Sequence, residues 1–353
     1  MTSLDELFDT ARADVENGWL PSCQLAVARD GELLALETFG DATDDTRYCI
    51  FSCTKPIVAS AIWLLIGAGR LDPARPVAHY IPEFAANGKE AVTVEQVMVH
   101  TSGFPNARMR EVDGIDAERR VATLAKWELE WEPGTRFEYH GTSAHWVLVD
   151  LIERLGGIDF RDFIEQRVTA PLGLPRLLGI AENDQANVAS LIAVGDAPLD
   201  GPSDAALLRL NRPEVRSAGV PGSGAIMRAA DLALFYQGLL SNPGGLWDAG
   251  VLDDAKTNVR CEFPDNLLQV PVNRTLGLVL AGDDGQHFMR YGSFGVANSP
   301  RSIGHAGAHM HVGWADPETG ISFAYCTNGL DNDVMKEGAR GVNLSGIAAA
   351  LDA

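Results

Sequence analysis

The sequence predicts an α+β fold in which both chain ends build one antiparallel sheet and a mainly helical segment is inserted between them. Strand-like patterns occur at residues 24–37 and again after residue 275, and helical spacing dominates the long stretch between them. We expect a sheet part from 1–50 and 275–353 and a helical part from 51–274, together one compact unit. A cleft between the two parts is the expected position of a site.

Composition supports a folded, globular protein. The chain has 353 residues, of which 46% are hydrophobic and 22% charged, enough for one large domain or two moderate ones. Its formal net charge is -20, which argues against nucleic acid or an anionic membrane surface as a partner. A small neutral or cationic molecule is a better match to this charge.

The expected compartment is the cytoplasm. The five cysteines include no C-x-x-C pair, and a chain of this length needs no disulfide to fold, so reduced thiols are expected. The first residues are acidic and lack the apolar run of a secretory signal. No stretch of about 18 apolar residues is present, so no membrane span is expected.

The N-terminal elements are predicted from periodicity and turn residues. Residues 3–17 have apolar positions at helical spacing, with Ser3 as the cap. Residues 24–29 and 32–37 are expected strands around Asp30-Gly31, a typical hairpin turn. An apolar helix is expected to follow from about residue 52 and to end at Gly67-Ala68-Gly69.

The middle and the C-terminal part are predicted in the same way. Residues 181–224 carry many turn residues and are expected to be irregular loops. The expected helices are 93–99, 116–127, 142–155, 160–168, 229–240 and 334–351. The expected C-terminal strands are 276–280, 308–314 and 321–327.

The candidate nucleophile is Ser52. Ser52 and Lys55 are three residues apart and share a face if this run is helical. Burial lowers a lysine pKa, so a neutral amine that can take the serine proton becomes accessible. Pro56 fits the first turn of a helix, whose N-terminal N–H groups also favour an oxyanion. Taken alone, S-x-x-K is a weak pattern, most often a solvated serine beside a surface lysine.

Further segments strengthen this interpretation because they occur in a set order. They are Ser52-Cys53-Thr54-Lys55, His100-Thr101-Ser102-Gly103-Phe104-Pro105, residues 133–139, Pro171-Leu172-Gly173-Leu174, residues 222–231 and His305-Ala306-Gly307. Together they resemble the serine β-lactamase and penicillin-binding-protein superfamily, specifically the class C β-lactamase-like branch that includes many carboxylesterases. The resemblance covers most of the chain and implies a β-lactamase-like fold without a cofactor.

The resemblance also implies roles for individual residues. Ser52 would be acylated, and Lys55 and Tyr139 would share the proton transfers; which of the two is the base stays open. The backbone N–H groups of Ser52 and Ala308 would form the oxyanion hole. His305, Gly307 and Gly141 would line the substrate cleft, and Trp314 and Trp131 are further candidates to reach it.

Two positions depart from the β-lactamase pattern. The second motif of these enzymes is Tyr-x-Asn, but here it is Tyr139-His140-Gly141, which lacks the side-chain amide. The third motif has His305 where β-lactamases usually carry lysine, so a substrate carboxylate loses a fixed cation. Both departures favour esters over β-lactams.

Other interpretations of single residues are less specific. His305, His309 and His311 alternate as on one strand face, yet no Cys or carboxylate completes a metal-ligand set, so no metal site is expected. Cys53 points about 100° away from Ser52 on a helix and is expected to be a packing residue.

The sequence therefore predicts a serine carboxylesterase that acts on short-chain esters through a Ser52 acyl-enzyme. The partner would be a small ester or amide, and the oligomeric state is left open. Within the same fold, the alternatives are a β-lactamase, a D-amino-acid peptidase or an acyltransferase. An alternative of another class is a non-catalytic binding or sensor module that retains the serine.

Overall fold

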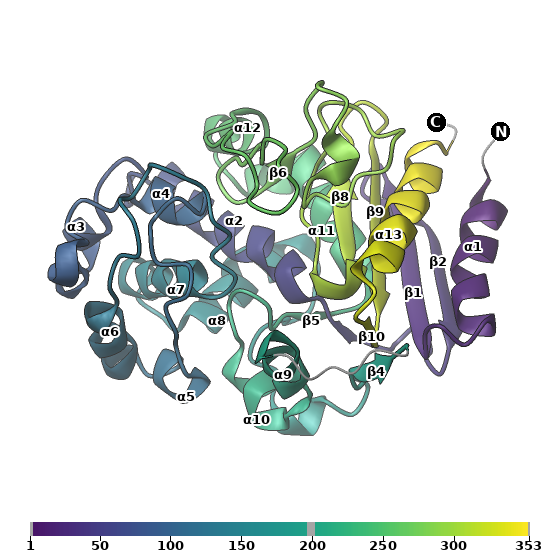
Figure 1. The fold of residues 1–353 in the computed structure, drawn as a ribbon, viewed down its shortest axis with the longest axis horizontal. Coiled ribbons are helices and arrows are strands. Elements are labelled where there is room, and N and C mark those ends of the chain that lie inside the picture. Colours follow the sequence, from purple (N-terminus) through teal and green to yellow (C-terminus); the bar gives the residue numbers. More distant parts are fainter. Residues whose placement is uncertain (1–2, 196–201, 352–353) are drawn as a thin grey trace.

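A six-stranded antiparallel sheet forms the right-hand half of the molecule in Figure 1, with strand order β2-β1-β9-β8-β7-β6. The structure, a computed structural model, describes residues 3–195 and 202–351. The strands are β1 (Ser22–Arg29), β2 (Glu32–Gly40), β6 (Val279–Leu280), β7 (Ile303–Gly304), β8 (Val312–Ala315) and β9 (Ile321–Thr327). Two small pairs lie outside this sheet: β3 (Tyr48–Cys49) with β5 (Ile226–Met227), and β4 (Ile192–Val194) with β10 (Gly329–Asp331).

The sheet joins the two ends of the chain. β1 and β2 form the predicted hairpin around Asp30-Gly31, and β1 also pairs along its length with β9, from Cys23 opposite Thr327 to Arg29 opposite Ile321. The first helix, α1 (Leu4–Glu16), and the last, α13 (Val334–Ala349), contact each other beside the sheet (Figure 1). The prediction of an antiparallel sheet made by both termini is confirmed.

Helices cover both faces of this sheet because the strand side chains alternate between two cores. Leu25 and Val27 face α1 (Leu4–Glu16) and α13 (Val334–Ala349), whereas Ala26 and Ala28 belong to the core on the side of α11 (Ala229–Ser241). α11 approaches closely, since a Cβ on Gly313 of β8 would lie 2.8 Å from the Tyr236 ring. By its contacts α11 therefore belongs with the sheet, although it lies within residues 51–274.

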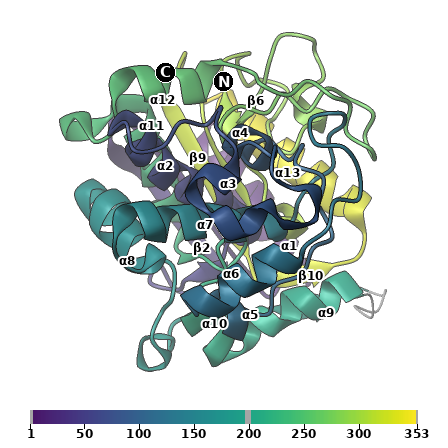
Figure 2. The same cartoon turned by 90° about the vertical axis from the view of Figure 1, so that its left-hand side faces the viewer.

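The remaining helices form the other half of the molecule, which faces the viewer in Figure 2. They are α2 (Thr54–Gly67), α3 (Val77–Tyr80), α4 (Val94–Met98), α5 (Glu111–Gly114), α6 (Ala117–Lys126), α7 (Ser143–Gly156), α8 (Phe160–Ile164), α9 (Pro202–Leu208), α10 (Pro213–Ala218) and α12 (Ala249–Thr257). α2 lies centrally between them and the sheet (Figure 1) and contacts α7, α8 and α12. A helix that is apolar all round is stable only when it is covered on every side, as α2 is here.

Three of the predicted segments differ in the structure. Residues 181–224 are not wholly irregular, because they contain β4, α9 and α10; residues 196–201 of this stretch lie outside the described part. The strand predicted at 276–280 is reduced to β6. The strand predicted at 308–314 begins only at Val312, because His309 and Met310 have positive φ angles of 54° and 56°. His305, His309 and His311 therefore do not share a regular strand face.

The described residues also bear on two chain-wide expectations. All five cysteines are buried and free of disulfide bonds. Within 3–195 and 202–351, none of the helices combines the length and the apolar character needed to cross a lipid bilayer.

Candidate active site

Ser52 lies in a tight turn that leads directly into α2. The turn comprises Phe51–Cys53, and Ser52 is partly exposed whereas both neighbours are buried. Phe51 has a φ of 45°, an uncommon conformation for a bulky residue, and its ring packs edge-on against His311 at 5.0 Å. Local strain of this kind gathers at functional positions, where packing holds it in place. The packed turn presents the Ser52 hydroxyl at the start of a buried helix.

Lys55 lies beneath Ser52 in the first turn of α2 and is almost completely buried. Its Nζ atom is 3.0 Å from Ser52 Oγ, 2.8 Å from the carbonyl oxygen of Gly141 and 2.7 Å from that of Gly222. Burial lowers the pKa of Lys55 well below its ordinary value, and the nearby charge of Arg274 lowers it further. The two carbonyls can only accept hydrogen bonds, so a neutral amine would give them its two N–H groups and keep its lone pair for Ser52.

Tyr139 lies beside this pair, just before α7. The Lys55 Nζ atom is 5.0 Å from the centre of its ring, and the His100 ring packs against it at 4.8 Å. Burial raises the pKa of Tyr139 to about 12, although Arg274 and the Ser52 hydroxyl both act to lower it. The hydroxyl is buried and forms no hydrogen bond of good geometry with any described group. Tyr139 is thus a neutral phenol beside Ser52 at neutral pH.

His305 joins the sheet to the site through both sides of its ring. Nδ1 is 2.7 Å from the carbonyl oxygen of Ala306, which can only accept, and Nε2 is 2.9 Å from Nη1 of Arg274, which can only donate. These contacts define a neutral ring with its proton on Nδ1. Burial and Arg274 also lower the pKa of His305 well below its ordinary value. Neither ring nitrogen is left free for the substrate contact expected from the sequence.

Gly307 brings the third motif against the turn that carries Ser52. A Cβ at this position would lie 2.6 Å from the Ile50 carbonyl oxygen, so only glycine fits without a shift. The Cys53 thiol donates to the His305 carbonyl oxygen at 3.1 Å and ties the same two segments together. Ala308 is the first residue of a short turn, Ala308–Met310, and is only partly buried. Cys53 therefore packs and links segments, in keeping with its predicted structural role.

Gly141 adjoins open space. A Cβ at position 141 would meet no atom within 4 Å. The backbone carbonyl oxygen of Gly141 accepts a hydrogen bond from Lys55 Nζ. Of the two hydroxyl residues that follow Gly141, Ser143 donates its hydroxyl to the carbonyl oxygen of Pro105 at 3.4 Å. Thr142 is exposed. The missing amide of the second motif thus leaves room beside Lys55.

Two aromatic candidates do not join the site. Trp314 is fully buried on the opposite face of the sheet, where its Nε1 donates to Ser345 Oγ at 3.1 Å and its ring packs on Phe323. The prediction that Trp314 reaches the substrate is wrong, because the strand alternation turns it toward α1 and α13. Trp131 lines a separate surface pocket with Leu129.

Arg274 was missed by sequence analysis. Its side chain is 1% exposed, contacts His305 and has its guanidinium carbon 5.3 Å from the Tyr139 ring centre. The available signal was its position two residues before the apolar run 276–280, because arginine is rarely buried unless it is paired.

Buried histidines support the loop that carries Tyr139. His140 Nε2 accepts from the Phe104 backbone N–H at 3.1 Å, and the His140 backbone N–H donates to Nδ1 of His100 at 3.3 Å. Burial lowers the pKa values of His100, His140 and His145. In the described part of the chain, no group of three or more His, Cys, Asp or Glu side chains is placed to hold a metal ion.

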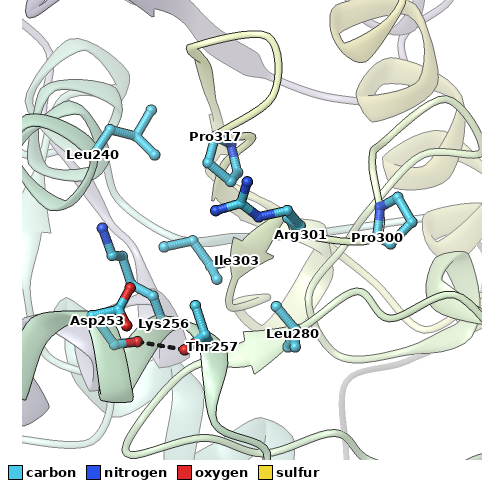
Figure 3. Close-up of a pocket in the computed structure, with 9 residues that line it drawn as sticks. All are labelled: Leu240, Asp253, Lys256, Thr257, Leu280, Pro300, Arg301, Ile303 and Pro317. Carbon is cyan, nitrogen blue, oxygen red and sulfur yellow. Dashed lines mark hydrogen bonds between the residues drawn. The ribbon is translucent and has the colours of Figure 1, made fainter.

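A separate cavity of about 170 Å³ lies between α11, α12 and the β6–β7 edge of the sheet (Figure 3). Its lining residues are Leu240, Asp253, Lys256, Thr257, Leu280, Pro300, Arg301, Ile303 and Pro317. Thr257 Oγ1 donates to the Asp253 carbonyl at 2.8 Å, the dashed line in Figure 3. The cavity shares no residue with the cluster around Ser52.

Comparison with known sequences places this arrangement in a family. Residues 7–346 match the profile of the Beta-lactamase family. The chain is 27% identical over 318 residues to "Esterase/beta-lactamase LipL" of Mycobacterium tuberculosis, covering 81% of this chain and 70% of that protein. It is 31% identical over 198 residues to "Esterase EstB" of Burkholderia gladioli, covering 48% of this chain and 49% of that protein.

Solved structures agree on the fold. A family VIII carboxylesterase superposes with a TM-score of 0.78 at 22% identity, over 97% of this chain and 96% of the other. EstA from Arthrobacter nitroguajacolicus gives a TM-score of 0.79 at 23% identity, over 99% and 96%. At these identities the likeness shows the fold alone. The family profile, which spans nearly the whole chain, confirms the resemblance inferred from the motifs: this protein is a member of the β-lactamase family, with the fold of its serine hydrolases.

Proposed function

We propose that this protein is a serine carboxylesterase that acts by two-step acyl transfer through Ser52, with short-chain esters as substrates. The observation that carries the proposal is the position of Lys55 Nζ, 3.0 Å from Ser52 Oγ and held by two carbonyl oxygens. This arrangement favours a neutral amine whose lone pair faces the serine hydroxyl. It therefore favours Lys55, rather than the high-pKa Tyr139, as the base that activates Ser52.

Acylation follows from these positions. Ser52 Oγ attacks the ester carbonyl carbon while its proton passes to the Lys55 amine. The negative charge develops on the carbonyl oxygen, toward the backbone N–H groups of Ser52 and Ala308. The bond to the alcohol oxygen then breaks, and the Tyr139 hydroxyl gives its proton to the leaving alkoxide. The Lys55 ammonium returns its proton to the Tyr139 phenolate, which restores both groups.

Deacylation uses the same groups with water in place of serine. Lys55 takes a proton from water as its oxygen attacks the acyl carbon. The bond to Ser52 Oγ breaks, the serine regains a proton from Lys55, and the carboxylic acid leaves. No group outside the protein and water is needed for the proton balance.

The ester preference rests on the second and third motifs. Gly141 supplies no side-chain amide for the amide carbonyl of a β-lactam or a peptide, and His305 is neutral with both ring nitrogens engaged. The name of the Burkholderia gladioli relative, "Esterase EstB", supports this choice, whereas "Esterase/beta-lactamase LipL" names both activities.

The test is intact-protein mass spectrometry after incubation with a fluorophosphonate, together with a p-nitrophenyl acetate, butyrate and octanoate series. We expect one adduct on Ser52, turnover of the short esters and little turnover of nitrocefin. An adduct without ester turnover would overturn the esterase assignment in favour of the related amide- or acyl-transfer activities. Absence of both adduct and turnover would support a binding module instead.

A further inference from the structure

Arg274 is a buried cation without a carboxylate partner in the described part of the chain. None of the ion pairs in this part of the chain includes Arg274. The neighbouring Arg260, whose backbone N–H donates to the Arg274 carbonyl oxygen, forms ion pairs with Glu95 and Asp254. Arg274 Nη1 donates to His305, but its Nε and Nη2 are buried without a hydrogen-bond partner. A buried charge that is only partly compensated is costly, and such groups are retained where the charge has a use.

The guanidinium lies against two aromatic faces. Its central carbon is 5.3 Å from the Tyr139 ring centre and 5.8 Å from that of Phe137. Cation–π attraction offsets part of the desolvation of the guanidinium. Asp265 makes the smallest Coulomb contribution among the groups that raise the pKa of Arg274, and its Oδ1 accepts from two backbone N–H groups. Cys261 and Tyr291 also lie near Arg274, but burial raises the pKa of both and so favours their neutral forms. Tyr139 is therefore the group beside Arg274 that can become an anion in the catalytic cycle.

The other titratable groups around Tyr139 cannot supply a permanent charge. They are Lys55 from α2, His100 and His305 on either side of the ring, Tyr291 stacked on it at 5.8 Å, and the buried Cys53 thiol. Burial lowers the pKa of Lys55, His100 and His305, and so favours their neutral forms. Burial also lowers the pKa of Arg274, but the ordinary pKa of a guanidinium is so high that Arg274 keeps its charge throughout the reaction.

We propose that Arg274 is a positioning residue that holds His305 in the neutral tautomer with its proton on Nδ1. Arg274 also stabilises the phenolate that forms when Tyr139 protonates the leaving alkoxide. This inference rests on the proposed esterase reaction. In that step the O–H bond of Tyr139 breaks, a new O–H bond forms on the departing alkoxide, and the negative charge moves to the tyrosine oxygen. Arg274 transfers no proton; it makes the charged product of the transfer less costly.

The leaving group separates this role from a structural one. p-Nitrophenolate is a weak base that departs without a proton, whereas ethoxide needs one. Arg274→Met should therefore lower kcat/KM for ethyl butyrate by about 100-fold, the scale of general acid catalysis, and for p-nitrophenyl butyrate by less than about fivefold. Tyr139→Phe should show the same selectivity, and adding Arg274→Met to it should change the ratio little further.

Three further variants make the result interpretable. Arg274→Gln removes the charge but keeps a hydrogen-bond donor for His305, so it should resemble Arg274→Met and replaces it if that variant does not fold. Arg274→Lys keeps the charge and should restore most of the ethyl ester activity. Arg260→Met removes an arginine from the neighbouring segment and should leave the ratio of the two esters unchanged.

The pH profile gives an independent readout. Because the charge of Arg274 lowers the pKa of Lys55, Arg274→Met should raise that pKa and move the rising limb of kcat/KM to higher pH. Arg260→Met should not move this limb. If Arg274→Met lowers kcat/KM equally for both esters and does not move the rising limb of the pH profile, the proposed role of Arg274 is wrong. The proposed esterase function would not be affected by that result. Failure of the unmodified protein to hydrolyse either ester would instead overturn the proposed function.

Discussion

Lys55 Nζ lies 2.7 Å from the carbonyl oxygen of Gly222, 167 residues further along the chain. Together with the Gly141 carbonyl, this contact fixes the direction of the amine toward Ser52. The Gly222 position is tightly packed, since a Cβ there would lie 3.0 Å from the Gly141 oxygen and 3.5 Å from Lys55 Nζ. The base is thus oriented by two backbone groups that come from distant loops.

The first prediction concerns the identity of the nucleophile. Ser52→Ala should abolish the fluorophosphonate adduct and ester turnover, because among the described residues Ser52 supplies the one hydroxyl that is hydrogen-bonded to Lys55 Nζ. Cys53→Ala should keep at least about a tenth of the activity, since the thiol is buried and only links Cys53 to the His305 carbonyl. Mass spectrometry and ester assays check both variants. An active Ser52→Ala beside an inactive Cys53→Ala would refute the assignment.

The second prediction concerns pH. The pKa of Lys55 lies well below its ordinary value of 10.5, and the amine is the active form. Activity should therefore rise with pH through this lowered pKa and reach its plateau well below pH 10.5. Tyr139, whose pKa is raised to about 12, should cause no falling limb below pH ~11. A profile of kcat/KM from pH 4 to 10 measures the rising limb.

A matched control for the lysine is available in the same fold. Lys55→Met should lower kcat/KM by about 10²- to 10⁴-fold, the usual contribution of a positioned general base. Lys89 is also buried, but in the described part of the chain its Nζ donates to the carbonyl oxygens of Ala86 and Trp127 and to no serine hydroxyl. Lys89→Met should cost stability without moving the pH profile. Equal effects of the two substitutions on catalysis would contradict the role of Lys55.

The third prediction concerns the missing amide. Gly141→Asn should raise nitrocefin hydrolysis by about 2- to 10-fold, the rate equivalent of one hydrogen bond worth about 0.5–1.5 kcal/mol. The structure leaves open space for the new side chain. Thr142→Asn places the same amide one residue further on and should give no gain. Nitrocefin kinetics compare the two, and an equal gain from Thr142→Asn would show that position 141 is not special.

The fourth prediction concerns packing of the third motif. The φ of Gly307 is -95°, so alanine is sterically excluded rather than strained at the backbone; its Cβ would lie 2.6 Å from both the Ile50 oxygen and His311 Cβ. Gly307→Ala should lower the free energy of unfolding by about 1–3 kcal/mol and kcat/KM by at least tenfold, because Ala308 would shift relative to Ser52.

Gly338 provides the control for this substitution. It lies in α13, where an added Cβ would meet no atom within 4 Å. Gly338→Ala should raise stability by up to about 1 kcal/mol, because alanine favours a helix, and should leave activity unchanged. Thermal unfolding and ester assays of the two variants together separate crowding at the site from a general intolerance of alanine.

Local patterns predicted the elements whose causes are local. The hairpin around Asp30-Gly31, the amphipathic α1 and the buried α2 follow from turn chemistry and apolar spacing. Prediction failed at 308–311, where positive φ angles at His309 and Met310 depend on packing around Phe51 and α13 rather than on propensity. It also failed for Trp314, because alternation along a strand does not say which face meets the cleft.

By itself, the sequence determined the α+β architecture, the pairing of the two chain ends and the proximity of Ser52 and Lys55, since these depend on periodicity and on a three-residue spacing within one helical run. Only the tertiary structure decided which groups surround the side chains of Lys55, Tyr139 and His305 and which protonation states those side chains favour. The carbonyls of Gly141 and Gly222 and the charge of Arg274 reach Lys55, Tyr139 and His305 from segments far apart in the chain. Desolvation and Coulomb interactions depend on distances in space, and those distances exist only once the chain has folded.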